Sequence, residues 1–297
     1  MPDAETYLLP QRAYLLSYRD QALPVRRVAL RDSRDHFDAV IDSVSRHEAQ
    51  LGLLGLIGDA MQTLEDVGTM ASAMMVGLAG LPFYVRATAY DPSDVNNFFA
   101  QIHKRDPDYF LRLCGFWFEG LSMHDFFELR PPLSVAERAA FDAAEEATAK
   151  LVAEHLGNLA REWERYRRFF HAYKHASLVA NPDDVEILDE DGEPVEGIVI
   201  WARRRDEAAV GNHATMPLPD IAEHIESVGK LAIDMASHLV ETRLGIFDII
   251  DFKPDGAVET KPLRGTPWEF WMRREDVGSK NLELLAGRGV VLAEPTP

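Results

Sequence analysis

The stretch SVAERAAFDAAEEATAKLVAEHLGNLAREWERYRRFFHAYKHASLVANP, residues 134–182, decides how this chain folds. It follows a Pro-Pro pair, and no proline interrupts it before Pro182. Its opening S-x-x-E is a capping box, in which the serine and glutamate side chains satisfy free N–H groups of the first helical turn. The stretch therefore predicts one helix of about 45 residues and about 65 Å, with Gly157-Asn158 as the expected bend.

Helical patterns also occur upstream of this stretch. Apolar residues at helical spacing begin near Asp35 and run, with a break, to about Gly80. Asp91 followed by proline indicates a helix start, and further helices are expected over 94–104 and 107–119.

The sequence changes character after Pro182. Two apolar runs, 185–188 and 195–201, flank a glycine-bearing acidic turn, which predicts a β-hairpin. A second clear helix is expected over 219–244, with Gly245 as its stop. Its apolar stripe has 4-3-4-3-4 spacing and consists of Ile221, Ile225, Val228, Ala232, Met235 and Leu239.

These patterns predict a mainly α fold: a long-helix bundle with a smaller C-terminal α+β part made of a β-hairpin and one long helix. The expected organisation is an N-terminal extension (1–34), a helical bundle (35–180) and an α+β part (181–297) that can share one core with the bundle. A helix as long as 135–180 exposes an apolar flank that a second chain can cover, so we expect a homodimer.

The charge of the chain is strongly acidic, because 31 Lys and Arg stand against 49 Asp and Glu, a net −18. Such a surface disfavours binding to phosphate backbones and to anionic lipid. The charge is uneven: residues 183–196 carry eight carboxylates and no basic group, whereas residues 161–175 carry a surplus of +3. We therefore expect a protein partner, and RNA only at Arg161–His175.

Compartment and membrane signals are few. The single cysteine, Cys114, excludes an intramolecular disulfide, and the N-terminus lacks a secretory leader, so a cytoplasmic location is expected. Val67–Val85 has 19 residues without a charge, but it is poor in Leu, Ile and Phe and contains Pro82. A buried core helix is therefore favoured, and no membrane contact is expected.

The segment Arg161–His175 concentrates charge, aromatic rings and imidazole. One helical face, at 4-3-4-3 spacing, carries Arg161, Arg165, Arg168, Ala172 and His175. The neighbouring face, expected on the core side, carries Trp163, Tyr166, Phe170 and Tyr173. Glu65-Asp66 is the carboxylate pair most suited to meet the arginines.

Three interpretations of this segment compete. In the structural one, the arginines pair with carboxylates and cover apolar surface, while the histidines interact with the helix dipole. In the metal-binding one, His171-x3-His175 places two imidazoles on one face. The H-E-x-x-H motif is absent, however, and none of the ten histidines has a carboxylate three residues before it. The sequence therefore predicts neither a metal nor a cofactor.

The third interpretation is phosphate chemistry. An arginine can hold a phosphate while a histidine moves a proton near neutral pH, and Arg165-x5-His171 and Arg168-x6-His175 both have suitable spacing. In this pattern and its helical setting the segment resembles the HEPN superfamily. The resemblance implies a metal-independent RNase of toxin–antitoxin or phage-defence systems, with its site at a dimer interface. It would make Arg168 the phosphate ligand and His175 the acid/base, with Arg165 and His171 as the alternative pair.

The chain departs from the usual HEPN form, because an aromatic residue rather than a polar one follows each arginine. Two other motifs carry weaker signals. His124-Asp125 resembles the central dyad of HD-type phosphohydrolases, with His103 and Asp142 as candidate partners, and Cys114 is expected to be a core residue. The glycines 52, 55 and 58 favour close helix packing over phosphate binding.

The function expected from the sequence is that of an interaction or regulatory protein without catalytic activity. The alternative is a HEPN-like metal-independent endoribonuclease. The enzyme requires Arg168 and His175 to be exposed together, whereas salt bridges to Glu or Asp favour the interaction protein.

Overall fold

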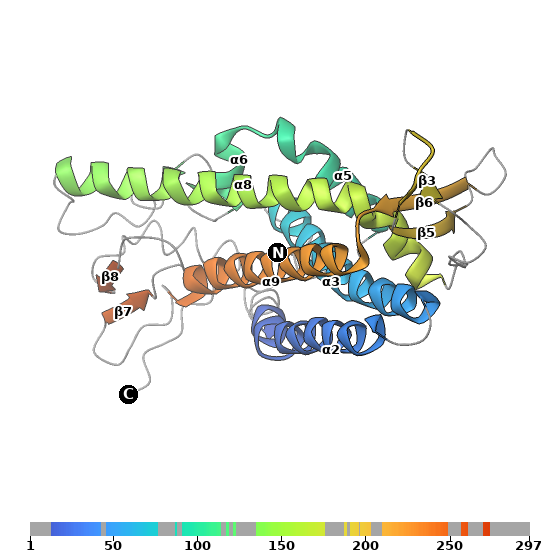
Figure 1. Ribbon diagram of the computed structural model, residues 1–297. Coiled ribbons are helices and arrows are strands. Elements are labelled where there is room, and N and C mark those ends of the chain that lie inside the picture. Colours follow the sequence, from blue (N-terminus) through green and yellow to red (C-terminus); the bar gives the residue numbers. More distant parts are fainter. Residues whose placement is uncertain are drawn as a thin grey trace. The chain divides into compact units, whose positions relative to one another are not determined.

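The structure is a computed structural model of the 297-residue chain, and Figure 1 draws its helices and strands. It describes residues 13–42, 46–76, 87, 91–113, 117–118, 121–122, 135–175, 187–188, 191–195, 197–202, 210–248, 257–260 and 270–273. The predicted capping box begins at Ser134 and therefore lies partly outside the described residues.

The described chain is mainly α, with a bundle of long helices and a smaller α+β part, as the sequence predicts (Figure 1). Four long helices are α2 (Leu23–Ile41), α3 (Arg46–Val76), α8 (Val135–Lys174) and α9 (Leu218–Asp248). α8 has 40 residues and is helical through Gly157 and Asn158.

The chain divides into two compact units. The first consists of residues 1–22, 68–157 and 235–297, and the second consists of residues 23–67 and 158–234. Three helices, α3, α8 and α9, each contribute residues to both units. The domain boundaries expected at residues 34 and 180 stay a prediction.

α3 is the central helix of the second unit. No residue from 52 to 67 is exposed, and leucine, isoleucine and methionine side chains such as Leu53, Ile57 and Met61 have no exposed surface. A helix segment buried in this way is covered by neighbours on all sides. The N-terminal half of α3 is accordingly contacted by α2, by α8, by α9 and by strand β5.

Two glycines of the predicted triplet mark close helix contacts in this unit. A Cβ placed on Gly52 would lie 3.4 Å from the Cα of Phe37 in α2, and one on Gly58 would lie 2.5 Å from the ring of Tyr173 in α8. Gly55 has no neighbour within 4 Å. Residues three apart on a helix are rotated by about 60° around its axis, so the glycines do not all face the same neighbour.

The strands form short antiparallel pairs. β3 (Ile187–Leu188) pairs with β4 (Pro194–Val195) across a turn in which Gly192 has φ 83°, so the predicted acidic hairpin is confirmed. β5 (Gly197–Ala202) pairs instead with β6 (Val210–Thr215), a partner that the sequence pattern did not indicate. Gln50 of α3 donates its Nε2 to the carbonyl of Gly197 and so fixes this second hairpin to the helices.

The first unit contains shorter elements. These are α5 (Pro92–Gln101), a 3-10 turn (Ile102–Lys104), α6 (Pro107–Leu113), β1 (Trp117–Phe118) with β2 (Leu121–Ser122), and β7 (Ala257–Thr260) with β8 (Phe270–Arg273). Asp91 caps α5 as predicted, because its carboxylate accepts a hydrogen bond from the N–H of Ser93 at 2.8 Å. The helix expected over 107–119 was too long, since Trp117 already belongs to a strand.

Two other predicted helix limits were wrong. The helical pattern was expected from Asp35, but α2 begins at Leu23 and follows a π-helical turn, Tyr18–Ala22. Only one α2 residue in seven is fully buried, which is too sparse a stripe to show in the sequence. α9 passes through Gly245 to Asp248, although glycine is a common helix stop.

Candidate functional site

The predicted arginine–histidine face lies on the solvent side of α8. Its exposed members are Arg161, Arg165, Arg168 and His175. The opposite side is core, and the residues there that are at most 3% exposed are Trp163, Tyr166, Phe169 and Phe170. The helical period therefore accounts for most of the division between the charged and the aromatic residues of this segment.

Two residues differ from the expected pattern. Ala172 was placed on the charged face, but it is buried, with 5% exposure. Tyr173 was placed on the core face, but it is 47% exposed and lies with its ring against Gly58. Tyr173 is in the last turn of α8, where one side of the ring covers α3 and the other side reaches solvent.

Several arginines of α8 have partners on the same helix. Arg161 donates to the amide oxygen of Asn158 at 2.5 Å, which leaves its charge uncompensated by that contact. Arg167 donates to Glu164 at 2.7 Å. These are exposed contacts, which contribute little to stability and leave the guanidinium groups accessible.

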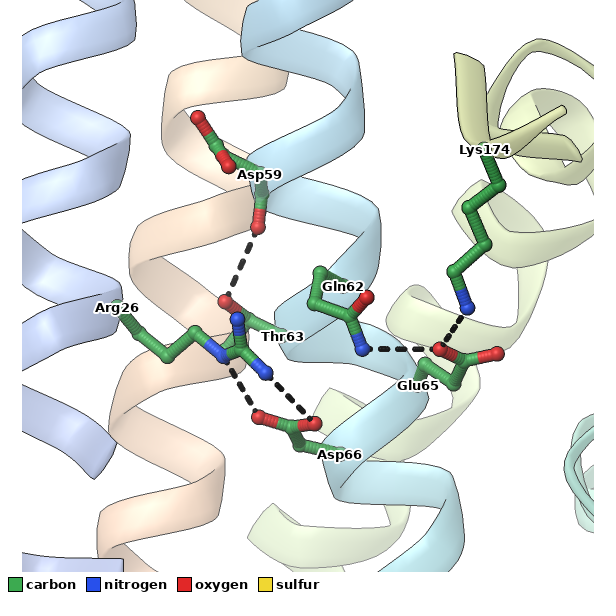
Figure 2. Close-up of polar contacts among 7 residues, drawn as sticks. All are labelled: Arg26, Asp59, Gln62, Thr63, Glu65, Asp66 and Lys174. Atoms are coloured by element: carbon green, nitrogen blue, oxygen red, sulfur yellow. Dashed lines mark hydrogen bonds and ion pairs between the residues drawn. The ribbon is translucent and has the colours of Figure 1, made fainter. Parts of the chain in front are cut away.

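The carboxylates expected to meet the arginines have other partners (Figure 2). Glu65, only 2% exposed, accepts hydrogen bonds from Lys174 at 2.5 Å and from Gln62 at 2.9 Å. Asp66 accepts a two-bond contact from Arg26 of α2, at 2.8 and 3.2 Å. One basic residue of the segment, Lys174, thus faces inward and joins α8 to α3.

The two histidines at the end of α8 stack on each other. The rings of His171 and His175 are 6.4 Å apart between centroids, with an angle of 9° between their planes. His171 is half-buried, and burial lowers its pKa below the ordinary value; the charges of His175 and Lys174 lower it further, while Glu65 opposes the shift. His171 is therefore neutral at neutral pH.

The two candidate Arg–His pairs differ in geometry. Arg165 and His171 are six residues apart and hence about 120° apart around the helix, so they do not share a face. Arg168 and His175 are seven residues apart, which places them on one face but about 10 Å apart along the axis. Both of these side chains are exposed.

A further polar cluster, between α8 and α9, was missed by the sequence analysis. Glu162 contacts His224 of α9 through Oε2 and Nε2 at 2.8 Å, and its Oε2 lies 3.7 Å from Arg165. The buried ring of Tyr166 lies 6.1 Å from that of His224, and burial raises the pKa of its hydroxyl. No sequence signal pairs Glu162 with a residue 62 positions away, so only the fold could reveal this contact.

The remaining sequence candidates contribute little to a site. Cys114 and the dyad His124-Asp125 lie outside the described residues. His103 is exposed in the 3-10 turn and lies near Gly157 in the first unit. The side chain of Asp142 is likewise outside the described part of the structure.

Within the described residues no group of three or more His, Cys, Asp or Glu side chains is placed to hold a metal ion. No described helix is long and apolar enough to cross a membrane. The part of Val67–Val85 that is described, up to Val76, belongs to α3, and Val67 and Met70 are at most 1% exposed.

Comparison of the chain with protein-family models, with curated proteins and with solved structures found no match.

Proposed function

We propose that this protein acts by binding a partner, without catalytic activity of its own, and that its docking surface is the exposed side of α8. We call this surface the basic face and define it as Arg161, Arg165, Arg168 and His175. The observation that carries the proposal is the exposure of three arginines along one side of a helix whose other side is core. We place this activity in the cytoplasm. Disulfides form mainly in oxidising compartments outside it, and a chain with one cysteine cannot form a disulfide within itself.

The geometry favours binding over catalysis because the candidate acid–base groups do not converge. Arg165 and His171 project in different directions, and Arg168 and His175 are two turns apart. Arg165 also has a carboxylate neighbour, Glu162, at 3.7 Å. Fixed cations along one face instead form a surface complementary to a row of carboxylates.

The partner we propose is the acidic segment 183–196 of a second copy of this chain. That segment carries eight carboxylates, and its described members Asp191 and Glu193 are exposed beside Gly192. Two copies repel each other through their net charge of −18 each. That repulsion is screened beyond about 8 Å at physiological ionic strength, whereas contacting charges are screened much less. A homodimer built this way can form at moderate salt and weaken at high salt.

Sedimentation equilibrium at moderate and at high salt tests this proposal. The reversal R161E/R165E/R168E should abolish the dimer. The control R27E/R31E/R112E changes three other exposed arginines, so it alters the net charge equally and should leave the dimer intact.

A charge-swap experiment then tests whether the acidic segment of a second copy binds the basic face. D191K/E193K should be monomeric alone, and mixing it with R161E/R165E/R168E should restore dimers through the swapped contact. A wild-type chain that stays monomeric at all concentrations, or a swapped mixture that does not associate, would exclude the second copy as the partner.

A metal-independent endoribonuclease of the HEPN-like type is the second candidate, and one observation favours it. Arg168 and His175 are both exposed on the same side of α8, so an RNA backbone lying along the helix can contact both. In that mechanism Arg168 holds the phosphate and His175 moves the proton, and a second copy completes the site.

Cleavage of labelled RNA in EDTA decides between the two functions. An enzyme should lose cleavage in R168A and in H175A, while H36A, which removes an exposed histidine of α2, should retain it. Absence of cleavage by the wild-type chain, or cleavage that survives both substitutions, contradicts the ribonuclease.

A further inference from the structure

His171 and His175 are the only two histidines of the sequence that are four residues apart. On a helix this spacing places side chains one above the other. The two rings are accordingly parallel to within 9°, and their centroids are 6.4 Å apart. The N–metal bonds of an imidazole site are about 2.1 Å long, so the exposed His175 ring has to turn until its ligating nitrogen lies within about 4 Å of that of His171.

Both imidazoles are accessible to a ligand. His171 is half-buried, His175 is exposed, and within the described residues neither ring makes a hydrogen bond or ion pair. His224 provides the contrast, because its Nε2 is already engaged by Glu162 at 2.8 Å. The nitrogens of the His171–His175 pair are thus open to a ligand that the protein itself does not supply.

We propose that His171 and His175 form a two-histidine site at the C-terminal end of α8 that binds a transition-metal dication of the copper, nickel or zinc class. Water completes the coordination, because no third protein ligand is placed there among the described residues. Lys174 and Arg167 repel a dication, so the site selects ions that gain most from imidazole ligation. Copper should bind most tightly, and magnesium and calcium, which prefer oxygen ligands, should not bind.

Metal binding at this spacing has a consequence for the fold. A chelate between residues four apart requires the last turn of α8 to be helical. The same turn carries Lys174, which reaches Glu65 of α3. The bound ion therefore favours the conformation in which α8 is fixed to α3, and this inference does not depend on the proposed docking surface.

Calorimetric titration of the full, tag-free chain with Cu²⁺, Zn²⁺ and Mg²⁺ in a non-coordinating buffer tests the site. The wild-type chain should bind one equivalent of Cu²⁺ tightly and one equivalent of Zn²⁺ more weakly. Its melting temperature should rise when either ion is added. H171A and H175A should each lose that equivalent, and H36A should keep it. A tight equivalent that persists in H171A or H175A, or wild-type binding no tighter than that of these variants, overturns the proposal.

A rescue variant separates chelation from any effect of the substitutions on folding. R167H/H175A restores a histidine four residues from His171 and should regain the tight equivalent. E164H/H175A places the second histidine two turns away and should not. Binding that returns equally in both double variants, or in neither, contradicts a chelate built on helical spacing.

Discussion

The part-buried contact between Glu65 and Lys174 offers the sharpest test of the packing of the second unit. Glu65 is 2% exposed, and its carboxylate is held by Lys174 at 2.5 Å and by Gln62 at 2.9 Å. The substitution K174M keeps most of the aliphatic stem, but it removes the ammonium group, which also lies 4.4 Å from the centre of the Phe170 ring. It therefore leaves a buried carboxylate without its counter-charge.

The magnitude follows from the exposure of the two partners. Removing one member of a buried ion pair costs about 3–5 kcal/mol, because the remaining charge stays desolvated. The Lys174 side chain is 31% exposed, so water can partly replace it, and Gln62 still donates to Glu65. We therefore expect K174M to lower the free energy of unfolding by about 3 kcal/mol. E65Q should cost only about 1 kcal/mol, because Lys174 can then turn to solvent.

Urea unfolding, followed by far-UV circular dichroism and tryptophan fluorescence, measures these differences. A shift of the midpoint at unchanged slope reports stability alone. The double variant K174M/E65M should be more stable than the sum of the losses of K174M and E65M alone predicts, because it leaves no charge buried. A loss below about 1 kcal/mol in K174M would show that the pair behaves as a solvated surface contact and would refute the reasoning.

Three further predictions concern packing, protonation and the α8–α9 contact. Gly55 has no neighbour within 4 Å, so G55A should raise the free energy of unfolding by about 0.5–1 kcal/mol. G229A should lower it by about 1 kcal/mol or more, because the new Cβ would lie 2.7 Å from a buried leucine of α2. Urea midpoints compare the two variants. Burial lowers the pKa of His171, so the unfolded chain binds more protons and stability falls as pH drops below about 6.5. In H171Q the melting temperature should fall less between neutral and acidic pH. E162Q weakens the contact of Glu162 with α9 and should lower the free energy of unfolding by about 1 kcal/mol. The control E164Q changes a carboxylate whose side chain is 68% exposed, and it should cost less than about 0.5 kcal/mol in the same unfolding assay.

The helices could be predicted from the sequence wherever burial repeats at helical spacing. All six apolar residues of the α9 stripe are at most 6% exposed, so the pattern identified both the helix and its inner face. α2 failed the same test, since Leu23, Leu30 and Phe37 are buried at intervals of seven residues with charged residues between them. β6, with the sequence VGNHAT, has too few apolar residues to be recognised without its partner strand.

Only those features of the site that depend on helical spacing could be predicted from the sequence. The period gives the direction of Arg161, Arg168 and Trp163 around α8, because direction depends on residue spacing alone. It does not give the partner of Lys174, which lies 109 residues away in the sequence. Glu65-Asp66 was expected to meet the arginines of α8, but the partners that the structure gives these carboxylates are Lys174 and Arg26.

The division of charge along the last turns of α8 follows from one physical constraint. A cation can lie against the core only where a carboxylate is already buried to receive it, because an unpaired charge there would be too costly. In this part of α8 Glu65 receives Lys174, and the half-buried His171 remains neutral instead. The arginines of the basic face are exposed, and there their charge carries no such penalty. The inward cation therefore stabilises the unit, and the exposed arginines are the ones on which the proposed docking depends.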